Sequence, residues 1–201
     1  MKITLFGASG TVGTYVLEEA ISRGHHVVAA TRRGKTLSTH PLVKHIAVNY
    51  DDISDIELAL ANSDAVIIVF AGSGRVAKST ANIIQAMKNQ HIKRLELLTA
   101  FGTSPEARKQ LGILTRLALI PFSPWFGDMP KQNKMASESG LDYTIVMPSW
   151  ITYEEGKTSY KHGDFKGKSA ISKIRRVNLA DFIINNLEQN AYIGESVYIQ
   201  E

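Results

Sequence analysis

The 201-residue sequence contains no cysteine, which excludes disulfide bonds, thiolate metal ligands and cysteine nucleophiles within it. Long apolar runs are also missing. None reaches the roughly 18 apolar residues of a membrane-spanning helix, so we expect no membrane partner. The first residues lead directly into an apolar strand, which predicts no signal peptide. Together these features favour a cytoplasmic protein.

The sequence also has no strong excess of positive or negative charge, because its formal net charge is only +4. Basic residues gather at 32–35 and 173–176, where an anionic cofactor or a solvated surface explains them better than nucleic acid does. The six histidines show no i, i+4 metal spacing, so we expect no metal site. A hydrophobic content of 44% is ordinary for a globular chain, and we predict a single domain over residues 1–201.

The first part of the sequence carries a strand, a glycine loop and a helix in succession. Residues 2–6 are apolar, residues 7–13 read GASGTVG, and residues 14–23 have helical spacing of apolar positions. This order is typical of dinucleotide binding, because the glycines permit a tight turn and close approach of the pyrophosphate to a helix N-terminus. A glycine-rich turn that binds nothing is the alternative. The cofactor-binding residues predicted here are Gly7, Ser9, Gly10, Thr11, Val12 and Gly13.

Arg32 and Arg33 follow the second predicted strand, residues 25–31. In a dinucleotide fold this position lies near the adenosine ribose, where an acid favours NAD and an arginine favours the 2′-phosphate of NADP. No acid occurs between Glu19 and Asp51. We therefore expect NADP(H) to be preferred over NAD(H), unless the arginines only occupy a solvated loop.

Strands alternate with helices along the rest of the sequence. Strands are expected at 44–48, 64–70, 94–99, 143–147 and 195–199, and the helices between them include 76–89, 131–139 and 178–188. A further helix is expected after Ser54, which with Glu57 has the form of a capping box. The alternation predicts an α/β fold with a doubly wound parallel sheet, in which ligands bind at the carboxyl ends of the strands.

Loops at those strand ends supply the remaining candidates. Further cofactor contacts are expected from Asp51, Asp52, Ala71, Gly72, Thr99 and Ala100. Substrate-side elements are expected at about 120–133 and 148–170, and a small hairpin is considered within 152–168. Residues 121–130 form a loop rich in proline and aromatic residues, which is typical of a substrate lid but also of ordinary core. The substrate contacts predicted are Phe101, Trp125 and Trp150.

Three segments carry a family resemblance: GASGTVG at 7–13, DAVIIV at 64–69 and SGLDYTIVMPSW at 139–150. With them the sequence resembles the atypical short-chain dehydrogenase/reductases, and most of all their NAD(P)H-binding branch, which contains the flavin reductases. The resemblance implies a Rossmann fold, cofactor along residues 7–13 and Arg32 near the 2′-phosphate. It also implies that Pro148, Ser149, Trp150 and Ile151 lie beside the nicotinamide.

Two positions depart from the family pattern. A catalytic Tyr-x-x-x-Lys motif would end at Lys134, but its first position is Pro130, so the tyrosine acid is missing. Thr99 stands where the flavin-reductase pattern has serine. Alcohol–ketone chemistry needs a proton donor of tuned pKa, so these departures weigh against it. Thr99 and Lys134 remain the candidate catalytic residues, and Lys134 is also expected to bind the cofactor by orienting the nicotinamide ribose. Each has a plain alternative, a threonine at a strand end and a lysine on a helix surface.

Hydride transfer to a flat conjugated acceptor requires less from the protein, since holding two rings face to face is the main task. The sequence therefore favours an NADPH-dependent reductase of flavins, quinones or tetrapyrrole-like acceptors, acting as a monomer or homodimer. A non-catalytic NADP(H)-binding sensor is the alternative. Epimerase- or dehydratase-like chemistry is a second alternative, disfavoured by the missing tyrosine.

Overall fold

A central sheet dominates the structure, a computed structural model that describes residues 1–70, 76–166 and 172–201. Within these ranges eight strands form one sheet in the order β3-β2-β1-β4-β5-β6-β10-β8. All neighbouring strands run parallel except β8, which is antiparallel to β10. Their bounds are β1 Lys2–Phe6, β2 His26–Thr31, β3 Val43–Ala47, β4 Ala65–Ile68, β5 Arg94–Leu98, β6 Asp142–Pro148, β8 Lys161–Gly163 and β10 Glu195–Gln200.

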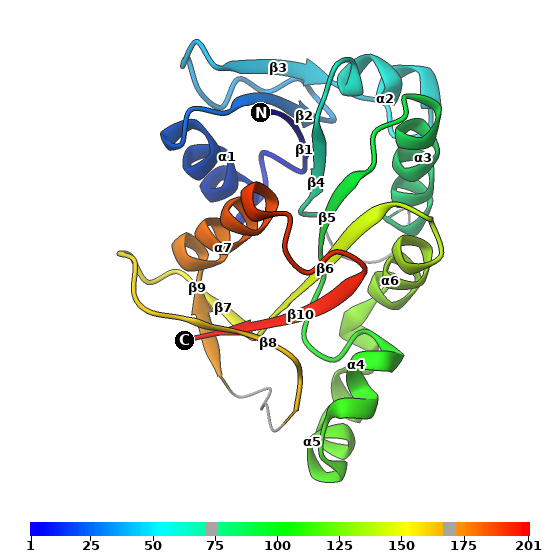
Figure 1. Ribbon diagram of the computed structural model, residues 1–201, viewed down its shortest axis with the longest axis vertical. Coiled ribbons are helices and arrows are strands. Elements are labelled where there is room, and N and C mark those ends of the chain that lie inside the picture. Colours follow the sequence, from blue (N-terminus) through cyan, green and yellow to red (C-terminus); the bar gives the residue numbers. More distant parts are fainter. Residues whose placement is uncertain (71–75, 167–171) are drawn as a thin grey trace.

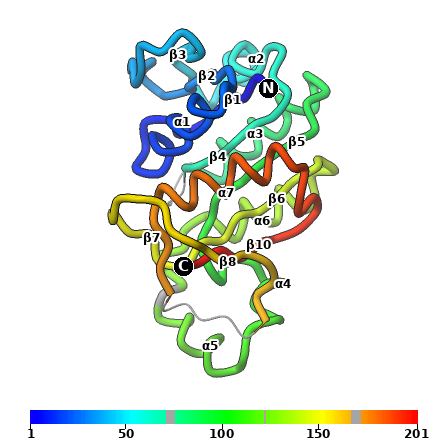
Figure 2. The backbone as a smooth tube through the Cα atoms, turned by 60° about the vertical axis from the view of Figure 1, so that its left-hand side comes forward, coloured from blue at the N-terminus to red at the C-terminus, as the bar shows by residue number. Residues whose placement is uncertain are grey.

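Helices cover both faces of this sheet (Figure 1). On one face lie α1 (Gly13–Ser22) and α7 (Arg176–Gln189), and on the other α2 (Ile53–Leu60), α3 (Val76–Asn89) and α6 (Met129–Ser137). The doubly wound α/β fold expected from the sequence is thus confirmed. Beyond the sheet, α4 (Pro105–Gln110), α5 (Ile113–Ala118) and the 3-10 helix η1 (Ile120–Phe126) follow one another. Figure 2 shows α4 and α5 at the end of the molecule opposite β3. No helix of the described ranges is long and apolar enough to cross a bilayer.

The strand order reverses between β1 and β4. The chain adds β2 and β3 on one side of β1 and then returns to place β4 on its other side, with Phe6 beside Ile68 in register. Both strands are buried on both faces, because their side chains fill the two hydrophobic clusters that lie on opposite sides of the sheet. The carboxyl ends of β1 and β4 therefore form the switch point at which such sheets bind ligands.

Three local expectations were wrong. Residues 152–168 form no hairpin over their described part, because β7 (Trp150–Thr152) pairs with β9 (Lys173–Arg175) while β8 pairs with β10. Residues 121–126 belong to η1, since proline is compatible with the first turn of a helix. The helix expected after Ser54 begins at Ile53, because the Asp52 carboxylate accepts the Ser54 N–H and caps the helix instead.

A buried carboxyl group joins the sheet to α7. Glu96 in β5 is 1% exposed, and its Oε1 accepts from Arg94 Nη2 at 2.5 Å and from Asn186 Nδ2 at 2.6 Å. Burial raises the pKa of Glu96 to about 8, although Arg94 and Asn186 both act to lower it. The network fixes the last helix against the strands that follow the switch point.

We predict that Glu96 makes the folded state sensitive to pH. Because the folded pKa is raised, its contribution to stability is complete below the ordinary pKa of 4.5 and is lost as the pH rises towards about 8. In urea unfolding, the wild type should lose free energy of unfolding relative to Glu96→Gln between about pH 5 and about pH 8. Exposed Glu18, changed to Gln, is the control and should leave the profile unchanged. Parallel profiles for wild type and Glu96→Gln would contradict this role.

Candidate functional site

The glycine loop, residues 7–13, connects β1 to α1 at the switch point. Gly7 has a φ of 88°, and its carbonyl oxygen accepts the Gly10 N–H at 2.9 Å. A β-carbon added at Gly13 would lie 2.1 Å from the same oxygen and 2.9 Å from the Cα of Ala8. Because no side chain fits there, α1 packs directly on the loop and its first turn faces the end of β1.

The outer side of this loop is open. Ser9, Gly10 and Thr11 are exposed, and α1 begins at Gly13 with Val12 as an N-cap residue that makes no side-chain cap. The first backbone N–H groups of a helix have no intrahelical partner and carry partial positive charge, so they attract an anion. A β-carbon at Gly10 would already lie 3.2 Å from the Gly7 oxygen. The loop therefore fits a pyrophosphate approaching close to the backbone.

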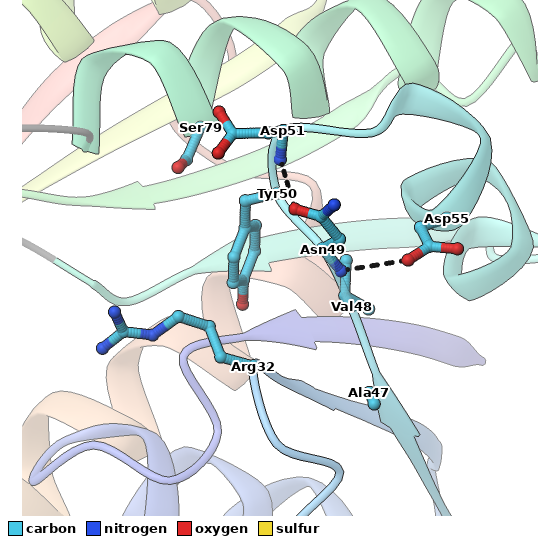
Figure 3. Close-up of a pocket in the computed structure, with 8 residues that line it drawn as sticks. All are labelled: Arg32, Ala47, Val48, Asn49, Tyr50, Asp51, Asp55 and Ser79. Carbon is cyan, nitrogen blue, oxygen red and sulfur yellow. Dashed lines mark hydrogen bonds between the residues drawn. The ribbon is translucent and has the colours of Figure 1, made fainter.

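A pocket of about 490 Å³ lies next to this loop, at the ends of β2 and β3 (Figure 3). In Figure 3 the Arg32 side chain extends below the ring of Tyr50, while Asp51 and Ser79 lie side by side at the opposite rim. The residues that line the pocket are Arg32, Ala47, Val48, Asn49, Tyr50, Asp51, Asp55 and Ser79. The pocket thus combines a guanidinium, carboxylates and an aromatic wall.

Tyr50 connects the pocket to the glycine loop. Its ring packs against Phe6 and Phe70, with centroid distances of 5.8 and 5.4 Å. Burial raises the pKa of its hydroxyl to about 12, against the opposing effects of the Arg32 charge and a hydrogen bond with the Gly7 backbone. Sequence reasoning missed Tyr50, although it directly precedes the predicted contacts Asp51 and Asp52. An aromatic residue just after β3 was the available signal.

The predicted charged contacts around this pocket have different environments. Arg32 and Arg33 are both exposed, and Arg32 lines the pocket. Asp51 forms an ion pair with Lys78 at 2.6 Å. The Asp52 carboxylate accepts the Ser54 N–H and caps α2, so helix capping by itself explains an acid at this position. Cofactor contacts by all four of these residues stay predictions.

A second group of predicted residues lies at the carboxyl ends of β5 and β6. Thr99 is buried, and its N–H donates to the Val146 carbonyl at 3.0 Å. Its hydroxyl lies 3.3 Å from that of Thr103, which donates to the Ala100 carbonyl at 2.7 Å and accepts from Asn133 Nδ2 at 2.9 Å. Sequence reasoning did not find Thr103 and Asn133, because only folding brings α6 against this strand end. These contacts fix the Thr99 side chain.

Residues 148–151 form the end of β6 and the start of β7. Pro148 accepts the N–H of Phe101 at 3.1 Å, so the ends of β5 and β6 are joined. Ser149 is buried and pairs with β10 through its N–H. Trp150 is 65% exposed, and Ile151 is half-buried against the core. The exposed indole is therefore available to a ligand.

Three further candidates differ in how accessible they are. The Lys134 side chain is 73% exposed and lies 3.8 Å from Glu138, as expected of a lysine on a helix surface. Phe101 is 5% exposed, and its ring packs on Phe165 and Tyr198 in the core. Trp125 is 73% exposed in η1. Roles for these three in cofactor or substrate binding stay predictions. Ala71 and Gly72 lie outside the described residues.

Comparison with known proteins identifies a shared family. A family model described as NAD(P)H-binding matches residues 7–190. Isoflavone reductase homolog A622 of Nicotiana tabacum is 25% identical over 160 residues, which cover 75% of this chain and 48% of that protein. The chain thus spans about half the length of the curated relatives it matches.

Solved structures share the fold over the whole chain. One is ChuY, described as an anaerobillin reductase from Escherichia coli O157:H7, with a TM-score of 0.82 and 21% identity. It matches 100% of this chain and 97% of its own. Another is a short-chain dehydrogenase/reductase from Veillonella parvula in complex with NADP, with a TM-score of 0.76 and 20% identity, covering 100% and 94%. At these identities the likeness concerns the fold.

We predict that adding a methyl group at Gly13 lowers the stability of the fold, whereas adding one at Gly10 lowers the affinity for dinucleotide. Gly13→Ala places a carbon 2.1 Å from backbone oxygen, so it should lower the free energy of unfolding by about 3 kcal/mol or more. Gly10→Ala meets only one contact at 3.2 Å, so it should fold and yet bind dinucleotide more weakly. Thermal unfolding and calorimetric titration with NADP⁺ measure both effects. Equal stability of the two variants would mean that α1 does not depend on this close contact.

Proposed function

This chain belongs to the NAD(P)H-binding family, as the resemblance of its sequence predicted, and we propose that it is an NADPH-dependent reductase of planar acceptors. The acceptors considered are flavins, quinones and tetrapyrrole-like compounds. The observation that carries the proposal is the open glycine loop adjoining a pocket lined by Arg32. Reductase names among the similar proteins also support it.

The preference for NADPH rests on charge. Arg32 lines the pocket at the end of β2, and Lys35 is a further exposed cation in the same connection. Among the residues that line this pocket, the carboxylates Asp51 and Asp55 follow β3 rather than β2. Guanidinium binds a phosphate dianion through charge-assisted hydrogen bonds, which a ribose hydroxyl cannot replace.

The reaction class rests on which proton donors the site offers. When bound, NADPH supplies a hydride. Pro130 stands at the position where the family motif has a tyrosine that serves as the acid. Lys134 is exposed, and its ammonium group lies near the Glu138 carboxylate. Thr99 has its hydroxyl fixed by Thr103, so it can orient a ligand through a hydrogen bond. Trp150 offers a flat apolar surface for stacking. A site of this kind aligns rings, and the acceptor's proton can come from water.

A non-catalytic NADP(H) sensor is the second candidate, and one observation favours it. Along α5 and the start of η1, four aliphatic side chains are 57–79% exposed: Ile113, Leu114, Leu117 and Ile120. Such a row of exposed apolar groups is typical of a surface that contacts another molecule. Tight cofactor binding without turnover of any planar acceptor would favour this candidate.

We predict that Arg32→Ala removes most of the preference for NADP(H). A charge-assisted contact to phosphate contributes roughly 1.5–3 kcal/mol, so wild type should prefer NADP⁺ by about tenfold or more. The variant should bind the two cofactors with similar affinity in calorimetric titrations. Lys93→Ala removes an exposed positive charge just before β5, at the amino end of that strand, whereas the pocket lies at the carboxyl ends of β2 and β3, and it should keep the preference. Equal affinities in the wild type would refute the NADPH assignment.

We also predict how turnover divides between Thr99 and Trp150. With NADPH and free flavin, Thr99→Val should lower kcat by less than about tenfold, because alignment dominates over proton transfer. Trp150→Ala should lower it further, since stacking surface is lost and water enters. Thr4→Val removes another buried hydroxyl, far from this strand end, and should affect stability alone. A loss of about 10³-fold in Thr99→Val with unchanged cofactor affinity would indicate acid–base chemistry at that hydroxyl.

A further inference from the structure

The connection between β2 and β3 carries three cations within four residues, Arg32, Arg33 and Lys35. It contains no helix or strand, and it runs along the upper left of Figure 1. All three cations are exposed, and like charges so close together repel one another. Without other contacts, this segment would sample many arrangements of its charges.

Two side chains of the sheet hold the backbone of this connection. Thr31, the buried last residue of β2, accepts the Lys35 N–H on its hydroxyl at 3.1 Å. His45, in the middle of β3, accepts the N–H groups of Leu37 and Ser38 on Nε2, at 2.9 and 3.3 Å. Three backbone donors of one short segment are thus turned towards the sheet.

The geometry at His45 defines its chemical state. A ring nitrogen that accepts N–H groups must carry a lone pair, so the imidazole is neutral with its proton on Nδ1. His45 is half-buried, and its backbone is fixed by pairing of Ala29 with His45 in the β2–β3 register. A strand that is paired with β2 along its whole length therefore presents the acceptor to a segment that has no secondary structure of its own.

Fixing this segment matters for anion binding because ordering costs free energy. Each backbone residue that becomes ordered on binding loses conformational entropy, and a segment ordered beforehand avoids that loss. Arg32 lies at the start of the held segment and lines the pocket next to the glycine loop (Figure 3). The contacts to His45 thus act on the same segment that carries the phosphate-binding charge.

We propose that His45 is a positioning residue that determines selectivity for the 2′-phosphate, by holding the segment from Arg32 to Ser38 in its binding conformation. It acts through the backbone of Leu37 and Ser38 and is not among the residues that line the pocket. The inference rests on the NADPH preference proposed above and extends it to a residue outside the pocket. It does not depend on whether the protein turns over an acceptor.

The test is calorimetric titration with two pairs of probes that differ only at the 2′-position: NADP⁺ against NAD⁺, and adenosine 2′,5′-bisphosphate against 5′-AMP. In His45→Ala we expect affinity for both 2′-phosphorylated probes to fall about threefold to tenfold, and affinity for the other two to change less than twofold. His45→Gln places an amide oxygen near the position of Nε2 and should restore most of the loss. Exposed His26, at the opposite end of β2, gives the matched control His26→Ala, which should behave as wild type.

A purely structural role predicts a different pattern. If His45→Ala weakens all four probes equally, or lowers the melting temperature without changing the ratio between paired probes, the proposal is wrong. The same holds if His45→Gln fails to restore the ratio in a folded protein. Equal affinity of wild type for NADP⁺ and NAD⁺ would overturn the cofactor preference and this inference together. Absence of turnover would affect the reductase proposal alone, since every probe here reports binding.

Discussion

The close packing of Gly13 on the carbonyl of Gly7 is the contact on which the rest of the site depends. It leaves no space for a side chain and so sets the distance between the end of β1 and the start of α1. The open backbone of residues 9–11 follows from this contact, because the loop must turn outward to reach the helix. Tyr50 packs against the same turn, through Gly7, and extends the site towards Arg32.

The loops at the carboxyl ends of the strands form two groups that differ in how many contacts hold them in place. In the cofactor group, the glycine loop, Tyr50 and the connection held by His45 are fixed by backbone contacts and buried rings. In the other group, Thr99 is held by a short hydroxyl network, while Trp150 remains largely exposed. This contrast agrees with a protein that binds one cofactor class closely and leaves more freedom to the acceptor.

The parts of the site that the sequence predicted well are those with a local cause. GASGTVG predicted a strand, a tight loop and a helix, because glycine spacing and apolar periodicity act within a few residues. The helix expected at 76–89 has those bounds in the structure. Errors occurred where neighbours in space decided the outcome. Asp52 capped α2 in place of Ser54, and β7 and β8 paired with different partners instead of with each other.

The sequence by itself determined the α/β order, the glycine loop between β1 and α1 and the position of Arg32 after β2, since each follows from short-range spacing and chain order. Only the tertiary structure decided which polar and aromatic residues meet. It buried Phe101 against Phe165 and Tyr198, left Lys134 on the surface, and brought Asn133 to Thr103 across thirty positions of the chain. It also placed His45 against the backbone of Leu37 and Ser38. Such contacts depend on how helices and strands pack together, and no local pattern in the sequence encodes that packing.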